Sequence, residues 1–409
     1  MGATLSAPPP PPPPPPDFAH TLFFVSAFYL AVLLLHVLLP GPRVEGYVCD
    51  WRGRVLTYKL NGFLLYLCTL GGFWYGGLPE ELTTYAAVNW WQSVKAANVL
   101  GLGGALLLMG LTLEPPFRAL TSDQKELCKR AAKGEDIMGA VTPAPQRNVA
   151  AHYFFGKAFN PRLLGIDLKM LLYALGAAAL TWNLCSALAL RISTHGALSN
   201  ALVLYSAMLL WFVGEYMLLE VIHLYTYDLM CEKLGFKLCW GCLVFYPYFY
   251  CIGVWPLVLD APAGADLAPP TIVAIALLFG CGWILTRGAN VQKYLFKTRG
   301  ALRASELMGG LNMEVVPSTR LLCSGFWGVS RHVNYLGEIL QATALALPGF
   351  LLATTTYYQI LPWLYPLYYV ALFVPRQIDD DLQLKLKYGE KAFTAYAKRV
   401  KYRIVPGIW

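Results

Sequence analysis

Long apolar stretches separated by short polar connectors dominate the hydropathy pattern of this 409-residue chain. A helix needs about 20 mostly apolar residues to cross the hydrocarbon core of a bilayer. The stretch from Ile339 to Val374, interrupted by Pro348 and Pro362, is long enough for two spans. The other candidates are Phe18–Leu39, Asn61–Leu78, Val99–Leu113, Met170–Leu190, Ala201–Ile222, Leu238–Leu259 and Thr271–Leu285. The pattern therefore predicts about eight to ten transmembrane helices.

Composition excludes an ordinary soluble protein. Hydrophobic residues make up 57% of the chain and charged residues only 14%, with a mean hydropathy of +0.48. Soluble domains carry about 25% charged residues. We therefore expect one all-α, polytopic membrane domain over residues 18–409, preceded by a disordered, solvated proline-rich arm over residues 1–17. Membrane lipid is an expected partner, and we expect no nucleic-acid partner.

The net charge of +8 comes from hydrophilic connectors. Lys and Arg gather in Phe117–Lys169, in Lys293–Arg320 and in the tail after Val374. The positive-inside rule places these segments on the cytosolic face, and the same segments could bind anionic lipid head groups. Within the tail, Asp379–Lys398 fits an amphipathic helix broken near Gly389, which would form a short soluble cap.

The ten cysteines do not indicate a metal site. Cys239 and Cys242 form a C-x-x-C pair, but it lies in an apolar run with no second pair and no neighbouring His. Zinc sites need two such pairs or added His residues. We interpret both cysteines as small residues of the membrane core, and we expect no bound metal.

Seven short blocks carry a resemblance to a known family. In chain order they are YKLNG (58–62), FNPRLLGIDLKM (159–170), TYDL (226–229), RGANVQKYLFK (287–297), LLCSGFWGVSRHVNYLGE (321–338), KYGE (387–390) and YRIVPGIW (402–409). Together they resemble the sterol reductases of the endoplasmic reticulum membrane, over roughly residues 55–409. That family includes C-14 reductases, 7-dehydrocholesterol reductases, fungal C-24(28) reductases and the membrane domain of the lamin B receptor. The resemblance implies about ten transmembrane helices and NADPH as hydride donor.

The resemblance also implies a cofactor site in the C-terminal half, about residues 285–409. Dinucleotide phosphates are anionic and are best held by Lys and Arg donors, which these blocks supply. Lys293 and Lys297 lie one helical turn apart and match a phosphate-binding basic pair, although the family usually has Arg at the second position. The full set of implied contacts is Lys293, Lys297, Trp327, Arg331, Asn334, Tyr335, Arg376, Asp380, Lys387 and Tyr388. Snorkelling lysines and a helix-face ion pair are the alternative interpretations.

Saturating an isolated alkene requires a proton as well as a hydride, so a buried acid is expected. Ionisable residues inside a membrane are functional candidates because their burial is costly. The stretch WFVGEYMLLEVIHLYTYDL provides the group that we expect to supply the proton, Glu220, Tyr216 and Asp228. Glu220 and Asp228 match family positions. The chain departs from the family at Phe212, where a tyrosine is usual, and at Cys242, where an aspartate is usual.

The sequence therefore predicts an NADPH-dependent sterol reductase of the endoplasmic reticulum membrane, acting by protonation and hydride transfer. A ring double bond, C-14 or C-7, is preferred because the block around Asn334 and Tyr335 resembles ring-reducing members. The C-24(28) side-chain bond is the alternative, because that branch also lacks the aspartate at Cys242. Two other classes stay open: an inactive sterol-binding or scaffolding homologue, and a methyltransferase of the isoprenylcysteine type.

Overall fold

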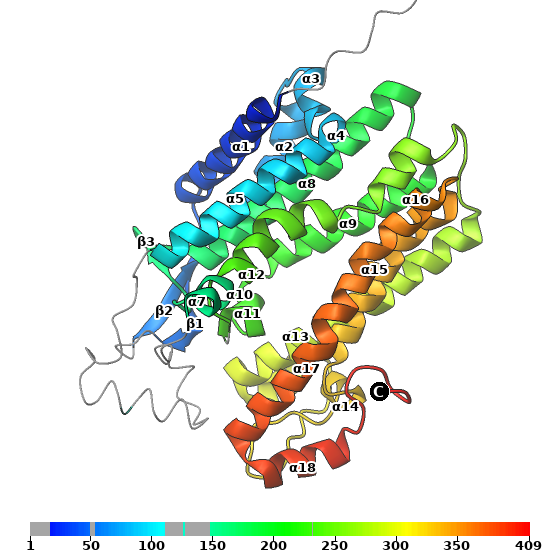
Figure 1. Ribbon diagram of the computed structural model, residues 1–409. Coiled ribbons are helices and arrows are strands. Elements are labelled where there is room, and N and C mark those ends of the chain that lie inside the picture. The colour runs from blue at the N-terminus through cyan, green and yellow to red at the C-terminus, as the bar shows by residue number, and fades with distance from the viewer. Residues whose placement is uncertain (1–16, 50–53, 111–125, 127–147, 231) are drawn as a thin grey trace, which may run out of the picture.

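The chain folds as a bundle of long helices in a computed structural model that describes residues 17–49, 54–110, 126, 148–230 and 232–409 (Figure 1). Almost the whole predicted proline-rich arm, residues 1–17, lies outside this range. Within it, six helices are long and apolar enough to cross a membrane. They are α1 (Phe18–Leu38), α5 (Trp90–Gly110), α8 (Leu168–His195), α9 (Asn200–Leu218), α13 (Pro269–Leu307) and α15 (Val333–Leu352). These findings confirm an all-α, polytopic membrane protein.

The remaining predicted spans are also helical, although their form differs. α2 (Gly62–Tyr75) is a shorter apolar helix, and α17 (Leu364–Tyr388) runs from apolar sequence into the charged tail. The stretch predicted over Leu238–Leu259 is not one regular helix. It divides into α12 (Phe236–Trp240), the π-helix η2 (Gly241–Phe249) and the π-helix η3 (Pro256–Asp260).

Short elements connect the long helices. Two antiparallel pairs of strands occur in the described residues: β1 (Arg43–Cys49) with β2 (Val55–Lys59), and β3 (Arg162–Leu163) with β4 (Ile166–Asp167). The short helices are α3 (Glu80–Thr83), α4 (Tyr85–Val88), α7 (Val149–Phe155), α10 (Glu220–His223), α11 (Tyr227–Met230), α14 (Phe326–Val329), α16 (Thr356–Ile360), the 3-10 helix η4 (Leu361–Trp363) and α18 (Glu390–Arg399).

The π-helix η2 is supported by hydrogen bonds from neighbouring helices. Pro247 lies inside it and has no backbone N–H to donate. The Tyr29 hydroxyl of α1 donates to the Leu243 carbonyl at 2.6 Å, and the Asn183 amide of α8 donates to the Pro247 carbonyl at 2.8 Å. Backbone groups within a bilayer must be satisfied inside the protein, so these two donors make the irregular helix tolerable there.

Glycines let α13 and α15 approach closely. A Cβ placed on Gly282 would lie 2.7 Å from the Gly337 carbonyl oxygen, and one on Gly337 would lie 2.2 Å from the Thr286 hydroxyl. Small residues at such contacts are typical of helix pairs in membranes. The contact brings the side chains that follow Thr286 and Gly337 into the same part of the interior.

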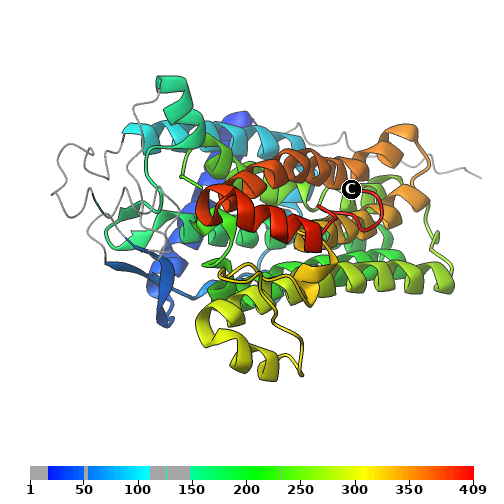
Figure 2. The same cartoon turned by 90° about the horizontal axis from the view of Figure 1, so that it is seen from below.

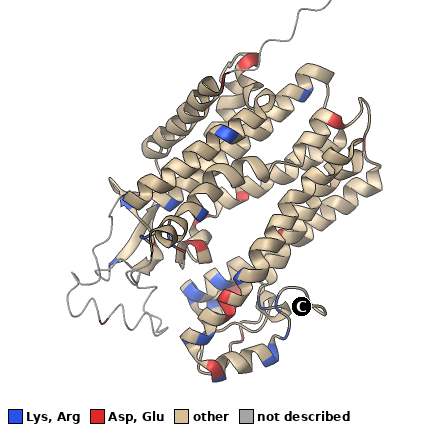
Figure 3. Cartoon of the chain, in the orientation of Figure 1, with Lys and Arg blue, Asp and Glu red and all other residues tan. Residues whose placement is uncertain are grey.

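The C-terminal segment forms the predicted amphipathic cap. α17 ends at Tyr388, Gly389 takes a left-handed φ of +85°, and α18 follows, which confirms the break expected near Gly389. Figure 2, viewed from below, shows α18 in front of the long helices at this end of the bundle. Basic residues of Lys293–Arg320 and of the tail gather at the same end (Figure 3). Most of the third basic connector, Phe117–Lys169, lies outside the described residues.

Candidate functional site

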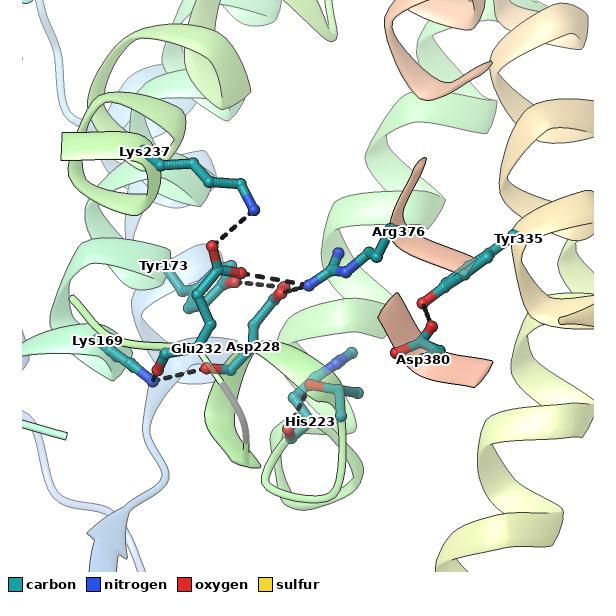
Figure 4. A network of polar contacts seen from close by, with 10 residues as sticks. Lys169, Tyr173, His223, Asp228, Glu232, Lys237, Tyr335, Arg376 and Asp380 are labelled. Carbon is teal, nitrogen blue, oxygen red and sulfur yellow. Dashed lines mark hydrogen bonds and ion pairs between the residues drawn. The ribbon is translucent and has the colours of Figure 1, made fainter. Parts of the chain in front are cut away.

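A polar cluster lies where the segment after α10 meets α17. The Arg376 guanidinium of α17 forms an ion pair with the Asp228 carboxylate and a second one, at 3.3 Å, with Glu232. The Tyr173 hydroxyl of α8 donates to Asp228 at 2.8 Å, and Lys237 contacts Glu232 at 2.8 Å (Figure 4). Residues from α8, α11, α12 and α17 therefore converge on two neighbouring carboxyl groups.

The two carboxyl groups of this cluster differ in their affinity for a proton. Burial disfavours the charged form of Asp228, but the Arg376 charge and the hydrogen bonds from Arg376 and Tyr173 outweigh it and lower the pKa of Asp228. For Glu232, burial and the neighbouring Asp228 charge raise the pKa. Asp228 is therefore the stronger acid of the pair and Glu232 the weaker one.

Asp380, one helical turn after Arg376, faces a different partner. The Tyr335 hydroxyl of α15 donates to the Asp380 carboxylate at 2.6 Å, and the His332 ring lies 3.6 Å from the same carboxylate. The Tyr335 ring stacks on Phe373 with a centroid distance of 4.3 Å. Figure 4 shows Arg376 between the Asp228–Glu232 pair and the Tyr335–Asp380 pair. The structure thus brings Arg376, Asp380 and Tyr335, three of the implied cofactor contacts, into one region.

Arg331 lies in a separate contact. Its guanidinium donates to the carbonyl oxygens of Val400 and Lys401 at 3.0 and 3.1 Å and to Asp381 at 3.2 Å. Its own backbone N–H donates to the Tyr402 carbonyl at 2.9 Å. Arg331 therefore fastens the C-terminal segment to the start of α15, and its guanidinium does not contact Arg376.

The other predicted cofactor contacts lie around the C-terminal half of α13 and the end of α17. The Lys293 ammonium lies 5.7 Å from the ring centre of Trp327, whose indole N–H donates to the Ala289 carbonyl at 2.9 Å. The Lys297 ammonium lies 4.4 Å from the Tyr47 ring centre. Asn334 of α15 accepts at its carbonyl from Thr286 at 3.0 Å, and the Lys387 ammonium lies 5.4 Å from the ring centre of the next residue, Tyr388.

Two of the three predicted proton-donating residues lie near each other, and the third points elsewhere. Tyr216 stacks on His223 with a centroid distance of 3.5 Å and lies 6.0 Å from the ring of Tyr173, the residue that donates to Asp228. The Glu220 carboxylate is buried and accepts from the Gly62 backbone N–H at 2.8 Å, at the start of α2.

A second charge cluster, between α9 and α13, is buried. The Arg287 guanidinium of α13 forms a 2.5 Å ion pair with Glu215 of α9, and both side chains are buried. Glu338 of α15 is within electrostatic reach of this pair. The sequence predicts no role for Glu215, Glu338 or Arg287, although Arg287 opens the RGANVQKYLFK block.

Several buried polar atoms around these two clusters have no hydrogen-bond partner in the described part of the chain. They include Arg287 Nε and Nη1, Arg376 Nε, Glu338 Oε2, Tyr246 Oη and His223 Nε2. Buried polar groups are rarely left unpaired in native proteins. These donors and acceptors are available to a bound polar ligand.

Comparison with known proteins agrees with the blocks quoted above. Residues 15–409 match the sequence profile of the ergosterol biosynthesis ERG4/ERG24 family. A Delta(14)-sterol reductase of Arabidopsis thaliana is 31% identical over 388 residues, which cover 94% of this chain and 95% of the relative. A Delta(14)-sterol reductase of Mus musculus is 33% identical, and the match covers 93% of this chain and 84% of the relative. A Delta(14)-sterol reductase of Methylotuvimicrobium alcaliphilum is 28% identical, and the match covers 94% of this chain and 82% of the relative. On this evidence, the chain belongs to the ergosterol biosynthesis ERG4/ERG24 family.

Proposed function

We propose that this chain is an NADPH-dependent sterol reductase of the endoplasmic reticulum membrane that saturates the C-14 ring double bond. The contact of Arg376 with Asp228 and Glu232 carries the proposal, because it joins an acid pair to the expected cofactor region at the end of an apolar bundle. The relatives named Delta(14)-sterol reductase, which match almost the whole chain, support the choice of bond.

The residues of the C-terminal half fit the charge of NADPH. Lys293 and Lys297 would hold phosphate groups, and Trp327 would pack against the dinucleotide beside Lys293. Contacts along the rest of the dinucleotide would come from Asn334, Tyr335, Arg376, Asp380, Lys387 and Tyr388. Arg331 would act indirectly, by fixing the C-terminal segment beside this region. When bound, the cofactor supplies the hydride.

The proton would be supplied from the Asp228–Glu232 pair. An unactivated alkene accepts a proton at one carbon and a hydride at the other, so the protein must hold an acid close to the substrate. Tyr173 donates to Asp228, and Tyr216 lies beside Tyr173, so the two hydroxyls could extend the acid pair toward a bound sterol. Glu220 is the third candidate. Its contact with Gly62 favours a role in joining α2 to α10.

The purified full-length protein in detergent provides the direct test. We would supply NADPH with a sterol carrying a C-14 double bond and identify the products by mass spectrometry. Parallel reactions would contain C-7 and C-24(28) unsaturated sterols. We expect the C-14 substrate to be consumed fastest. Preference for the C-24(28) sterol would overturn the choice of bond, and the absence of saturable NADPH binding would favour a scaffolding homologue.

A further inference from the structure

We propose that Lys169 is a positioning residue that holds Asp228 and Glu232 in place for proton delivery, an inference that rests on the proposed function. Lys169 lies in the first turn of α8 and has no solvent exposure. Its ammonium donates to the backbone carbonyl of Asp228 at 2.6 Å and also to the backbone carbonyl of Glu232 (Figure 4). Lys169 is therefore hydrogen-bonded to the main chain at both residues of the acid pair.

Asp228 and Glu232 direct their side chains toward a common partner, Arg376. The carboxyl groups of Asp228 and Glu232 both contact Arg376, and each also has a partner of its own, Tyr173 or Lys237. A carboxyl group can reach these partners only if its main chain is correctly placed. Since these two hydrogen bonds of Lys169 are with the main chain, they can set the orientation of both acids through the backbone.

Lys169 is itself held firmly. Asp167 caps the start of α8 by accepting from the backbone N–H groups of Lys169 and Met170 at 3.1 and 3.0 Å. The Lys169 ammonium also lies 5.7 Å from the ring centre of Phe159. Precise placement of functional groups requires support from rigid secondary structure. The first turn of a 28-residue helix provides such support.

A buried ammonium is costly, which argues that this one has a task. An uncharged side chain of similar length would fill the same space at a smaller desolvation cost. Lys169 instead places a positive charge and its N–H donors beside the main chain of Asp228 and Glu232. No role was predicted for Lys169, although it lies in the FNPRLLGIDLKM block.

The chain offers a matched control in Lys59. Its ammonium also donates to two backbone carbonyls, those of His36 and Val37, each at 3.0 Å, at the end of α1. Lys59→Met therefore removes the same kind of interaction at a place outside the acid cluster. Lys169→Met removes the donors at the site, and Lys169→Arg retains the charge and donors.

Steady-state kinetics of the full-length protein with NADPH and a C-14 unsaturated sterol test the catalytic consequence. We expect Lys169→Met to lower kcat about tenfold or more, because it loses charge-assisted hydrogen bonds, while the NADPH constant changes little. Lys169→Arg would recover much of the loss, and Lys59→Met would leave kcat near the wild-type value. Equal losses in Lys169→Met and Lys59→Met would overturn the proposal, as would a wild-type kcat in Lys169→Met.

Hydrogen–deuterium exchange in the cofactor-free protein tests the positioning directly. We expect amides in the peptide around Asp228 to exchange faster in Lys169→Met and unchanged in Lys59→Met. Unchanged exchange in Lys169→Met would contradict the proposal even if the enzyme proves inactive on every sterol. Should Lys169→Met not fold, Lys169→Gln, which keeps one donor group, takes its place in both measurements.

Discussion

Two arginines, the partly buried Arg376 and the buried Arg331, each meet an acid near the same end of the bundle, yet their surroundings differ. The terminal nitrogens of Arg331 contact Asp381 and two carbonyls of the adjoining C-terminal segment. Arg376 instead contacts Asp228 and Glu232, acids that lie more than 140 positions earlier in the chain. The Arg331 cluster fastens one segment to another, whereas the Arg376 cluster gathers titratable groups from distant elements.

The comparison shows why a family block does not assign one role to all its residues. The resemblance gave Arg331 and Arg376 the same role, that of a cofactor contact. The structure separates an anchoring arginine, bound mainly to backbone carbonyls, from an arginine bound to side-chain acids. The principal contact of one cluster joins Arg331 to Asp381 and that of the other joins Arg376 to Asp228, so matched substitutions can test the distinction.

The largest expected effect is on turnover in the pair Asp228→Asn and Asp381→Asn. Loss of a general acid or its hydrogen-bond partner costs about 10²–10⁴-fold in rate, so Asp228→Asn is expected to lose at least about a hundredfold in kcat. Asp381→Asn is expected to retain most of the kcat of its folded fraction. Both values come from sterol turnover normalised to folded protein. A greater loss in Asp381→Asn would reverse the assignment of the two clusters.

The arginine pair separates stability from cofactor binding. Removing one partner of a buried ion pair costs about 3–5 kcal/mol, so Arg331→Met, which breaks the buried pair with Asp381, should lower thermal stability by about that amount. The pair of Arg376 with Asp228 is more exposed, so Arg376→Met should lower thermal stability less. We expect Arg331→Met to loosen the C-terminal segment, seen as increased proteolysis near α18, with an unchanged NADPH constant in the folded fraction. Arg376→Met is expected to weaken NADPH binding. Identical NADPH constants in both variants would show that the two arginines do not differ in their contribution to cofactor binding.

A smaller effect is expected from the basic residues of α13. Lys293→Ala should raise the apparent NADPH constant about tenfold, since a charge-assisted contact contributes about 1.5–3 kcal/mol. Lys385→Ala is the control, because Lys385 lies at the same end of the molecule and pairs with the exposed Glu390 at 3.3 Å. Equal NADPH constants in both variants and the wild type would remove Lys293 from the cofactor site.

The smallest effect concerns acid stability. The pKa of Asp228 is lowered in the folded protein, so ionised Asp228 contributes stability above its unfolded pKa of about 3.9. That contribution is lost as the pH falls from about 5 toward the folded pKa. Thermal melts at descending pH should therefore show a steeper loss for the wild type than for Asp228→Asn, by on the order of 1 kcal/mol. Parallel curves would show that Arg376 does not stabilise ionised Asp228.

Much of the architecture could be predicted from the sequence. Length and hydropathy alone indicated the helical spans, because a bilayer imposes both requirements. The break at Gly389 was also predicted, since glycine readily takes the positive φ found there. The irregular helix over Gly241–Phe249 was missed, because the sequence there is as apolar as a regular span and its hydrogen-bond donors, Tyr29 and Asn183, lie far away in the chain.

The candidate site was predicted only in part. The resemblance assigns Arg376, Asp380 and Tyr335 to one site, and these side chains lie in one region of the structure. Tyr173 and Glu232 were missed because nothing local marks them, and their importance comes from contacts with Asp228 and Arg376. Glu220 illustrates the reverse case, since a buried acid near Asp228 in sequence directs its carboxylate toward Gly62.

The dependence of η2 on its neighbours bears on how the protein assembles in the membrane. A regular transmembrane helix satisfies its own backbone and can insert as an independent unit. η2 acquires donors for the Leu243 and Pro247 carbonyls only when α1 and α8 are already beside it. This segment therefore reaches its final form late in biogenesis, after its two supporting helices have come together around it.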